Sequence, residues 1–217
     1  MLPSQRSWNR KIIVFSAFSC LMSAPGSAQG PTPADRVAAL FESSFAYEAK
    51  GNSSKALADT QEILQLQPSH YVANLRAGWL AYATQRYEES LNHYNRAAEL
   101  APRAVEPQLG VLLPLMALKR WPQAETIAKG ILAVVPRNYL ASSRLAFTEF
   151  SLAHYRQAEG LYAQVLSDYP GDLEMMLGLG WTQVRLGKKD DARAGFTQVL
   201  GISRQNASAK AGLEACK

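Results

Sequence analysis

The sequence predicts an all-α solenoid made of stacked copies of one helix pair. Prolines recur every 34 residues, at Pro68, Pro102, Pro136 and Pro170. A fixed period between 20 and 50 residues is typical of repeat architectures. A second row with the same period holds only small side chains: Ala56, Ser90, Ala124, Ala158 and Ala192. No long stretch alternates polar and apolar residues with a period of two, so no sheet is expected.

Placing each proline at position 32 of a 34-residue unit sets the boundaries of the repeats. The repeat domain spans residues 37–217, and its five units are 37–70, 71–104, 105–138, 139–172 and 173–206. The expected helices run over 35–50 and 53–67, then 71–84 and 87–101, and so on to 173–186 and 189–202. Residues 206–216 predict one further helix, which would cover the apolar end of the last unit.

Three positions of the unit explain why it would fold as two packed helices. Small residues at positions 8 and 20, such as Gly78 and Ser90, would let the two helices cross closely. An aromatic at position 17, such as Tyr87, would begin the second helix, and proline at position 32 would end it. The third unit is irregular because Pro114 falls in the middle of a helix, where it predicts a kink.

The N-terminus has the layout of a secretory signal peptide over residues 1–28. Basic residues up to Lys11 precede an uncharged apolar run over 12–24, and small residues follow up to Ala28, near which we expect cleavage. The alternatives are an uncleaved membrane anchor and, less favoured because the usual preceding leucine is missing, lipid attachment at Cys20. Residues 29–36 are expected to form a flexible lead. The protein is therefore expected in the periplasm or outside the cell, with no stable membrane span after cleavage.

Charge and cysteine content argue against a nucleic-acid-binding protein and against a fold held by internal disulfides. Lys and Arg number 23 against 18 Asp and Glu, but three of the basic residues lie within residues 1–28. The remaining balance is close to neutral and gives no sign of a nucleic-acid partner, which would need a clustered basic face. Cys216 is the one cysteine after residue 28, so no internal disulfide can form there.

These positions resemble those of the tetratricopeptide repeat (TPR) family, whose 34-residue unit follows a W-x2-L-G-x2-Y, A-x3-F, P pattern. The second unit fits best, at Ala77-Gly78, Tyr87, Tyr94, Ala97 and Pro102. The fifth fits at Leu179-Gly180, Ala192 and Phe196, with Arg204 in place of the proline. The resemblance covers residues 37 to about 204. It implies a superhelical TPR solenoid of about five helix-turn-helix repeats plus a C-terminal capping helix.

The chain carries little that suggests catalysis. His70, His93 and His154 fall at different unit positions and do not share a helix face, so no histidine pair for a metal arises. Gly178-Leu179-Gly180 lies within an expected helix and does not follow a strand, so it does not predict a phosphate site. The sequence has no P-loop, nucleophile elbow or C-x-x-C motif. We therefore expect that the protein is not an enzyme and that it binds neither a cofactor nor a metal.

The resemblance implies that the first helices line a concave groove, with positions 2, 5, 9 and 12 commonly facing it. Apolar and aromatic side chains fill most of these positions, and the nearby cations are few, unlike in members that clamp a C-terminal carboxylate with basic residues and asparagine. Packing within the core is the alternative for each aromatic residue. The predicted partner-binding groove consists of Phe41, Phe45, Leu75, Arg76, Trp79, Tyr82, Leu113, Met116, Arg144, Phe147, Phe150 and Trp181.

The predicted function is a non-catalytic adaptor or scaffold. It would bind an apolar peptide or helix of a protein partner in the concave groove, in an exported, periplasmic compartment. The alternative is a self-associating structural protein that forms homo-oligomers through the groove or the solenoid ends. A third possibility is an accessory subunit that positions an enzyme, and the sequence does not separate it from the first.

Overall fold

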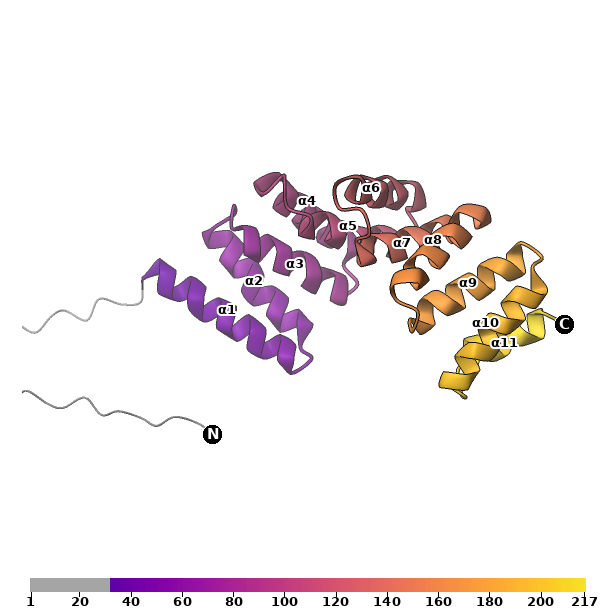
Figure 1. Ribbon diagram of the computed structural model, residues 1–217. Helices are drawn as coiled ribbons and strands as arrows, with labels where there is room; N and C mark the ends of the chain where they lie inside the picture. Colours follow the sequence, from indigo (N-terminus) through magenta and orange to yellow (C-terminus); the bar gives the residue numbers. More distant parts are fainter. Residues whose placement is uncertain (1–31) are drawn as a thin grey trace, which may run out of the picture.

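The computed structural model describes residues 32–217, in which all regular secondary structure is helical (Figure 1). The first helices of the five units are α1 Pro33–Ala49, α3 Tyr71–Ala83, α5 Glu106–Ala117, α7 Tyr139–Ser151 and α9 Leu173–Arg185. The second helices are α2 Ser53–Leu66, α4 Tyr87–Leu100, α6 Trp121–Val134, α8 Tyr155–Asp168 and α10 Lys189–Ile202. A last helix, α11 Ala207–Ala215, follows. The predicted fold class, a TPR-type solenoid of five helix pairs and a C-terminal helix, is confirmed.

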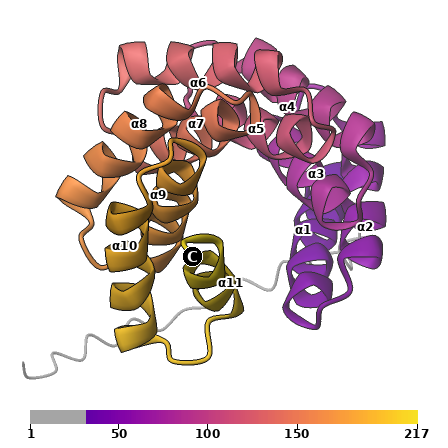
Figure 2. The ribbon, with the colours of Figure 1, turned by 90° about the vertical axis from the view of Figure 1, so that its right-hand side faces the viewer.

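The helix pairs stack into a curved array. Consecutive helices pack against each other, and α5 also contacts α3 and α7, while α7 contacts α9. Figure 2 shows the odd-numbered helices on the inside of the arc and the even-numbered ones on its outside. The first helices therefore form the concave side, and α11 packs against α9 and α10 at one end. Within residues 32–217, every helix is too short or too polar to be a candidate membrane span.

The prediction of a flexible lead over 29–36 is corrected from Pro33 onward, because α1 begins there, while residues 29–31 lie outside the described residues. The Thr32 hydroxyl accepts the backbone N–H of Asp35, and the Asp35 carboxylate accepts that of Thr32 at 2.8 Å. This reciprocal capping box, with proline in the first turn, starts the helix earlier than the repeat register indicates. Residues 33–36 are thus helical. The predicted signal peptide, its cleavage point at Ala28 and the acceptor Cys20 all lie outside the described residues.

The turn after each second helix does not depend on its proline. At Pro68 the His70 N–H donates to the Gln67 carbonyl at 3.1 Å, across a tight turn. The corresponding bond in the fifth unit, from Asn206 N–H to the Ser203 carbonyl, measures 3.0 Å although Arg204 replaces the proline. Proline favours this turn by fixing φ, but the capped helices on both sides suffice to hold it. Pro114 is buried, and α5 continues through it to Ala117.

The two helices of a unit cross closely where the sequence places small residues. The Ser44 hydroxyl of α1 donates to the Ala56 carbonyl of α2 at 2.8 Å. The Ser90 hydroxyl of α4 donates to the Gly78 carbonyl of α3 at 2.7 Å. Side chains at positions 8 and 20 thus reach the backbone of the partner helix directly. The predicted reason for small residues at these positions is confirmed.

Successive units interlock through aromatic rings at position 24 of the second helix. The ring of Tyr94 lies between Gly78 of its own unit and Gly110 at position 6 of the next. A Cβ at these glycines would lie 2.8 Å and 2.2 Å from ring carbons. Phe196 lies in the same way between Gly180 and Gly212, where the distances would be 2.8 Å and 2.4 Å. Each ring thus occupies the space that a side chain at position 6 of the following helix would need.

Where position 24 is small, position 6 of the next unit carries an arginine. Thr60 is followed by Arg76, and Ala128 by Arg144. The Thr60 and Ser44 hydroxyls lie 3.0 Å apart, and Arg76 Nε donates to Ser44 at 2.9 Å, so the arginine packs over the small residues. The two arginines therefore replace missing rings at the junctions between units.

Candidate functional site

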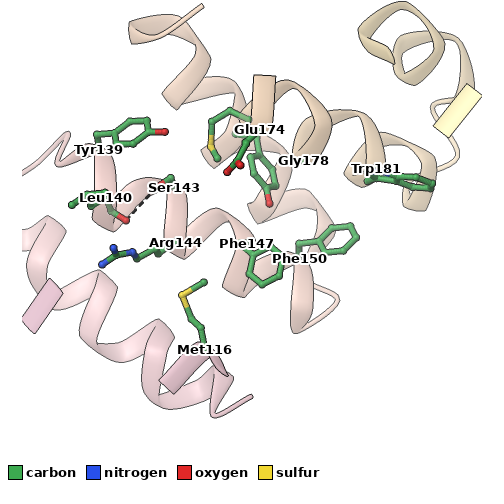
Figure 3. Close-up of a pocket in the computed structure, with 12 residues that line it drawn as sticks. Met116, Tyr139, Leu140, Ser143, Arg144, Phe147, Phe150, Glu174, Gly178 and Trp181 are labelled. Carbon is green, nitrogen blue, oxygen red and sulfur yellow. Dashed lines mark hydrogen bonds between the residues drawn. The ribbon is translucent and has the colours of Figure 1, made fainter. Parts of the chain in front are cut away.

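A cavity of about 670 Å³ opens on the concave side of the C-terminal half. Its lining comes from α5, α7, α8 and α9, so it spans three units, as Figure 3 shows for most of its side chains. The residues that line it are Met116, Tyr139, Leu140, Ser143, Arg144, Phe147, Phe150, Tyr162, Glu174, Met175, Gly178 and Trp181. Most of its surface is apolar, which is typical of a pocket that takes a hydrophobic side chain.

The aromatic residues of the cavity differ in how firmly they are held. Trp181 packs edge-on against Phe196, with ring centroids 5.4 Å apart, and its Nε1 donates to the Ser208 hydroxyl at 2.9 Å. Phe150 packs against Tyr155 at 5.6 Å. Phe147 is 45% exposed although its edge meets Trp121. Phe147 therefore offers the most accessible aromatic surface of the three.

Arg144 supplies the positive charge at this cavity. Its Nη1 donates to the Leu109 carbonyl at 2.6 Å. Among residues 32–217, no carboxylate lies within 4.0 Å of its guanidinium. Burial lowers the pKa of Arg144 from its usual value, although Tyr94 and Tyr82 act in the opposite direction. The guanidinium stays charged at any physiological pH, so a cation is held here at some cost in solvation.

The cavity gathers part of the predicted groove. Met116, Arg144, Phe147, Phe150 and Trp181 all line it. Sequence reasoning missed several other lining residues: Tyr139, Leu140, Ser143, Tyr162, Glu174, Met175 and Gly178. Leu140 and Glu174 stand at position 2, one of the positions that face the groove, and a full reading of that position would have found them. Tyr162 reaches the cavity from a second helix through the gap left at Gly178, which only the interlocking rings reveal.

In the N-terminal half of the predicted groove, the polar groups of the side chains are paired with one another. Arg76 is nearly buried, with its guanidinium 3.9 Å from the ring centre of Phe45 and Nη1 2.7 Å from Glu48 Oε2. Trp79 Nε1 donates to the same Glu48 carboxylate at 2.7 Å. The charge of Arg76, a predicted groove residue, is therefore already paired within the protein. The rings of Phe45 and Trp79 remain exposed.

The other predicted groove residues lie outside the cavity and are partly buried in packing. Phe41 packs on the cluster around Leu40 and Ile63, and Leu75 on the cluster around Tyr94 and Leu112. Tyr82 lies against the rings of Trp79 and Tyr87. Leu113 is half-buried. For this group, Phe41, Leu75, Tyr82 and Leu113, the alternative of core packing describes the contacts better than exposure to a partner.

One charged cluster lies at the junction of α6, α7 and α8. Ligand atoms of Glu125, Glu149 and His154 all lie within 4.8 Å of one another. Lys129 is ion-paired with Glu125 and, at 3.1 Å, with Glu149, while His154 Nδ1 lies 2.8 Å from Glu149. The Lys129 hydrogen bond lowers the pKa of Glu125. Because the lysine ammonium already bridges the two carboxylates, we interpret the cluster as an ion-pair network between units.

Comparison with solved structures gives the same fold. The MamA 41-end fragment from Desulfovibrio magneticus RS-1 superposes with a TM-score of 0.73, at 16% identity over 80% of this chain and 98% of that one. YrrB, described as a TPR protein with an unusual peptide-binding site, gives a TM-score of 0.67 at 15% identity over 81% of this chain and 90% of that one. TTC0263, a thermophilic TPR protein of Thermus thermophilus, gives 0.63 at 16% identity, covering 83% and 98%. These likenesses concern the fold alone.

Sequence comparisons point to the same repeat. A curated relative, "Protein CTR9 homolog" of Arabidopsis thaliana, is 26% identical over 126 residues. That match covers 58% of this chain but only 12% of the plant protein, so it concerns the repeats and not the whole relative. Models of the tetratricopeptide repeat match residues 46–105 and 150–216, which together make up more than half of the chain. The protein is a member of the tetratricopeptide repeat family.

Proposed function

We propose that the protein is a non-catalytic adaptor that binds an apolar peptide or helix of a protein partner. The observation that carries this proposal is the cavity between α5, α7 and α9, which lies on the concave side and exposes Leu140 and Phe147. Large exposed apolar patches on soluble proteins commonly mark interaction sites, and buried aromatic anchors dominate binding energy. TPR arrays generally serve as interaction scaffolds, which agrees with this use of the groove.

The proposal includes the compartment. We propose that residues 1–28 direct export and that the adaptor works in a periplasm or outside the cell. The support is the basic, apolar and small-residue order of that segment. Fractionation of cells that express the full chain with a C-terminal tag tests it. Recovery in the cytoplasmic fraction, at the unprocessed mass, would contradict export.

The binding proposal is tested by capturing partners from an envelope extract with the full chain. Replacing both Leu140 and Phe147 by alanine removes exposed apolar surface, and because both side chains are more than 40% exposed the change costs little stability. Val134→Ala is the matched control, since Val134 is 76% exposed on α6, outside the cavity. A specific partner should be lost with the double variant and kept with the control. Equal capture by all three proteins would refute the groove proposal.

Self-association is the second candidate, and one observation favours it. Exposed aliphatic side chains recur at position 30 of three second helices, at Leu66, Val134 and Ile202. Such a row on the outer side of the solenoid could pack against a second copy. Mass in solution over a wide range of concentrations tests this: a monomer at every concentration rules it out.

A further inference from the structure

Arg76 and Arg144 stand at the same position of the second and fourth units, but their surroundings differ. Arg76 is paired with Glu48 at 2.7 Å, and Glu48 comes from position 12 of the preceding unit. The residue at that position before Arg144 is Met116. A thioether thus stands where a carboxylate would be needed to repeat the pair. Within the described part of the chain, Arg144 therefore lacks the acidic partner that Arg76 has.

The donors of Arg144 are only partly used. Within residues 32–217, its guanidinium makes one hydrogen bond, from Nη1 to the Leu109 carbonyl. A guanidinium offers five N–H donors in a planar fork that matches a carboxylate. Arg144 lines the cavity together with Met116 and Phe147. The remaining donors therefore have access to anything that enters the cavity.

Building on the proposed groove function, we infer that the bound segment carries one aspartate or glutamate side chain that pairs with Arg144. An apolar side chain next to that acid fills the cavity against Phe147. The acid takes at Arg144 the place that Glu48 takes at Arg76. The partner is thus an apolar segment with a single well-placed carboxylate, and not a uniformly apolar one.

Two features favour an internal acidic side chain over the carboxylate at a peptide's end. Aromatic rings lie on first helices before and after α7, which carries Arg144: Trp79 on α3 is exposed, and Trp181 on α9 lines the cavity. A segment that contacts both continues past Arg144 and does not end there. Glu174, at the other side of the cavity, repels a second acid, which limits the preference to one.

The pair is expected to contribute measurably to affinity, because Arg144 is largely shielded from solvent. Charge-assisted hydrogen bonds are stronger than neutral ones, and a partly buried pair is screened less by salt than a surface pair. Replacing the acid of the bound peptide by its amide should therefore weaken binding about tenfold or more.

The probe is a displayed library of random peptides, selected on the immobilised full chain. Selected sequences are then synthesised with the acid, with its amide, and with a free or amidated C-terminus, and each is titrated by calorimetry. Two variants remove the proposed pairing in different ways. Arg144→Met deletes the cation, whereas Met116→Glu supplies Arg144 with an internal carboxylate, as Glu48 does for Arg76. Arg185→Met, at an exposed arginine of α9 outside the cavity, is the control.

The expected result is enrichment of one Asp or Glu beside apolar residues in the selected peptides. Replacing that acid by its amide should weaken binding to the wild type and to Arg185→Met. The same replacement should not change binding to Arg144→Met or Met116→Glu. Apolar peptides without an acid preference, if lost on Leu140→Ala with Phe147→Ala, would overturn this inference and leave the groove function intact. An acid preference that persists in Arg144→Met, or that follows only the free C-terminus, would also overturn it. Selection of no peptide, or of peptides indifferent to the groove variants, would refute the groove function itself.

Discussion

Gly110 and Tyr94 occupy one shared space at the junction between the second and third units. A Cβ at position 110 would lie 2.2 Å from Cε1 of Tyr94, closer than any real contact of such atoms. The glycine is therefore required by the ring of the preceding unit, and not by its own backbone, which is helical. The space at this junction is filled by the ring of Tyr94 alone, and position 110 cannot add a side chain to it.

Gly110→Ala is expected to destabilise the protein by about 1–3 kcal/mol, because the buried ring must shift in a packed core. The matched control is Gly130→Ala, a helical glycine with nothing within 4 Å of its would-be Cβ, which should stabilise by up to about 1 kcal/mol. Urea denaturation measures both changes. Tyr94→Ala should remove most of the penalty of Gly110→Ala, and additive effects in that cycle would contradict the shared-space explanation.

Tyr94 also makes stability depend on alkaline pH. Burial raises its pKa from the usual 10.0 to about 12. A raised folded-state pKa means that the contribution is fully present below pH 10 and is lost as the pH rises from 10 through 12. At pH 11, Tyr94 should therefore cost about 1 kcal/mol of stability relative to its contribution at pH 9.

Tyr94→Phe tests this contribution without removing the ring. The free energy of unfolding of wild type minus that of the variant, measured by denaturation at pH 9 and pH 11, should fall by that amount. The other tyrosines and the lysines titrate in both proteins and cancel in this difference. A difference that does not change between the two pH values would show that the hydroxyl of Tyr94 is not desolvated in the folded protein.

The ion-pair network at Glu149 predicts unequal effects for its two partners. The Glu149 side chain is only 2% exposed, whereas that of Lys129 is 56% exposed. Lys129→Met leaves a buried carboxylate with less compensation and should destabilise by about 2–3 kcal/mol. Glu149→Leu removes the buried charge itself and should be close to neutral.

Lys188→Met provides the reference for an ordinary pair. Lys188 contacts Glu159 at 2.8 Å with 47% and 22% exposed side chains, so its loss should cost less than about 1 kcal/mol. Thermal and urea unfolding rank the three variants. If Glu149→Leu proves the most destabilising, the carboxylate is needed for more than satisfying its neighbours.

Removing residues 206–217 should lower stability and cause concentration-dependent association. The ring of Phe196 is fully buried, and Gly212 of α11 lies directly against it. Exposing the Phe196 ring would lower the free energy of unfolding by about 2 kcal/mol and leave an apolar surface through which two copies could associate. Light scattering across concentrations measures the association. Ser208→Ala, which loses only the bond from Trp181 Nε1, should remain like wild type in mass.

The sequence alone predicted the array because its units repeat on a fixed period. The row that contains Pro68 set the register, and the second helices begin at Tyr87, Trp121 and Tyr155, at the position where aromatic residues stand in the sequence. The start of α1 was misjudged because Thr32 and Asp35 form a local cap that lies outside the repeat pattern. Local chemistry decided that boundary, and no periodicity signals it.

The candidate site was predicted only in part, because side-chain pairing between units is not visible in a single position. Arg76 and Arg144 occupy the same position of their units, and their difference comes from the preceding unit, which supplies Glu48 to Arg76 but Met116 near Arg144. Tyr162 was missed because it belongs to a second helix. Glu149 was missed as a buried charge because its partner Lys129 comes from the preceding unit. These contacts depend on packing between helices far apart in sequence.

The alternation of ring and gap at the junctions also constrains how such a chain can evolve. Deleting the third unit would bring the ring of Tyr94 against Arg144, two bulky groups where one fits. Copying the third unit in tandem would leave Ala128 facing a glycine, and so an empty space. The order of the units is therefore constrained, because the residue at position 24 of each second helix must match the residue at position 6 of the helix that follows. Deleting or copying the third unit alone therefore requires a matching substitution at the new joint, whereas removing the second and third units together joins Thr60 to Arg144 and keeps a matched pair.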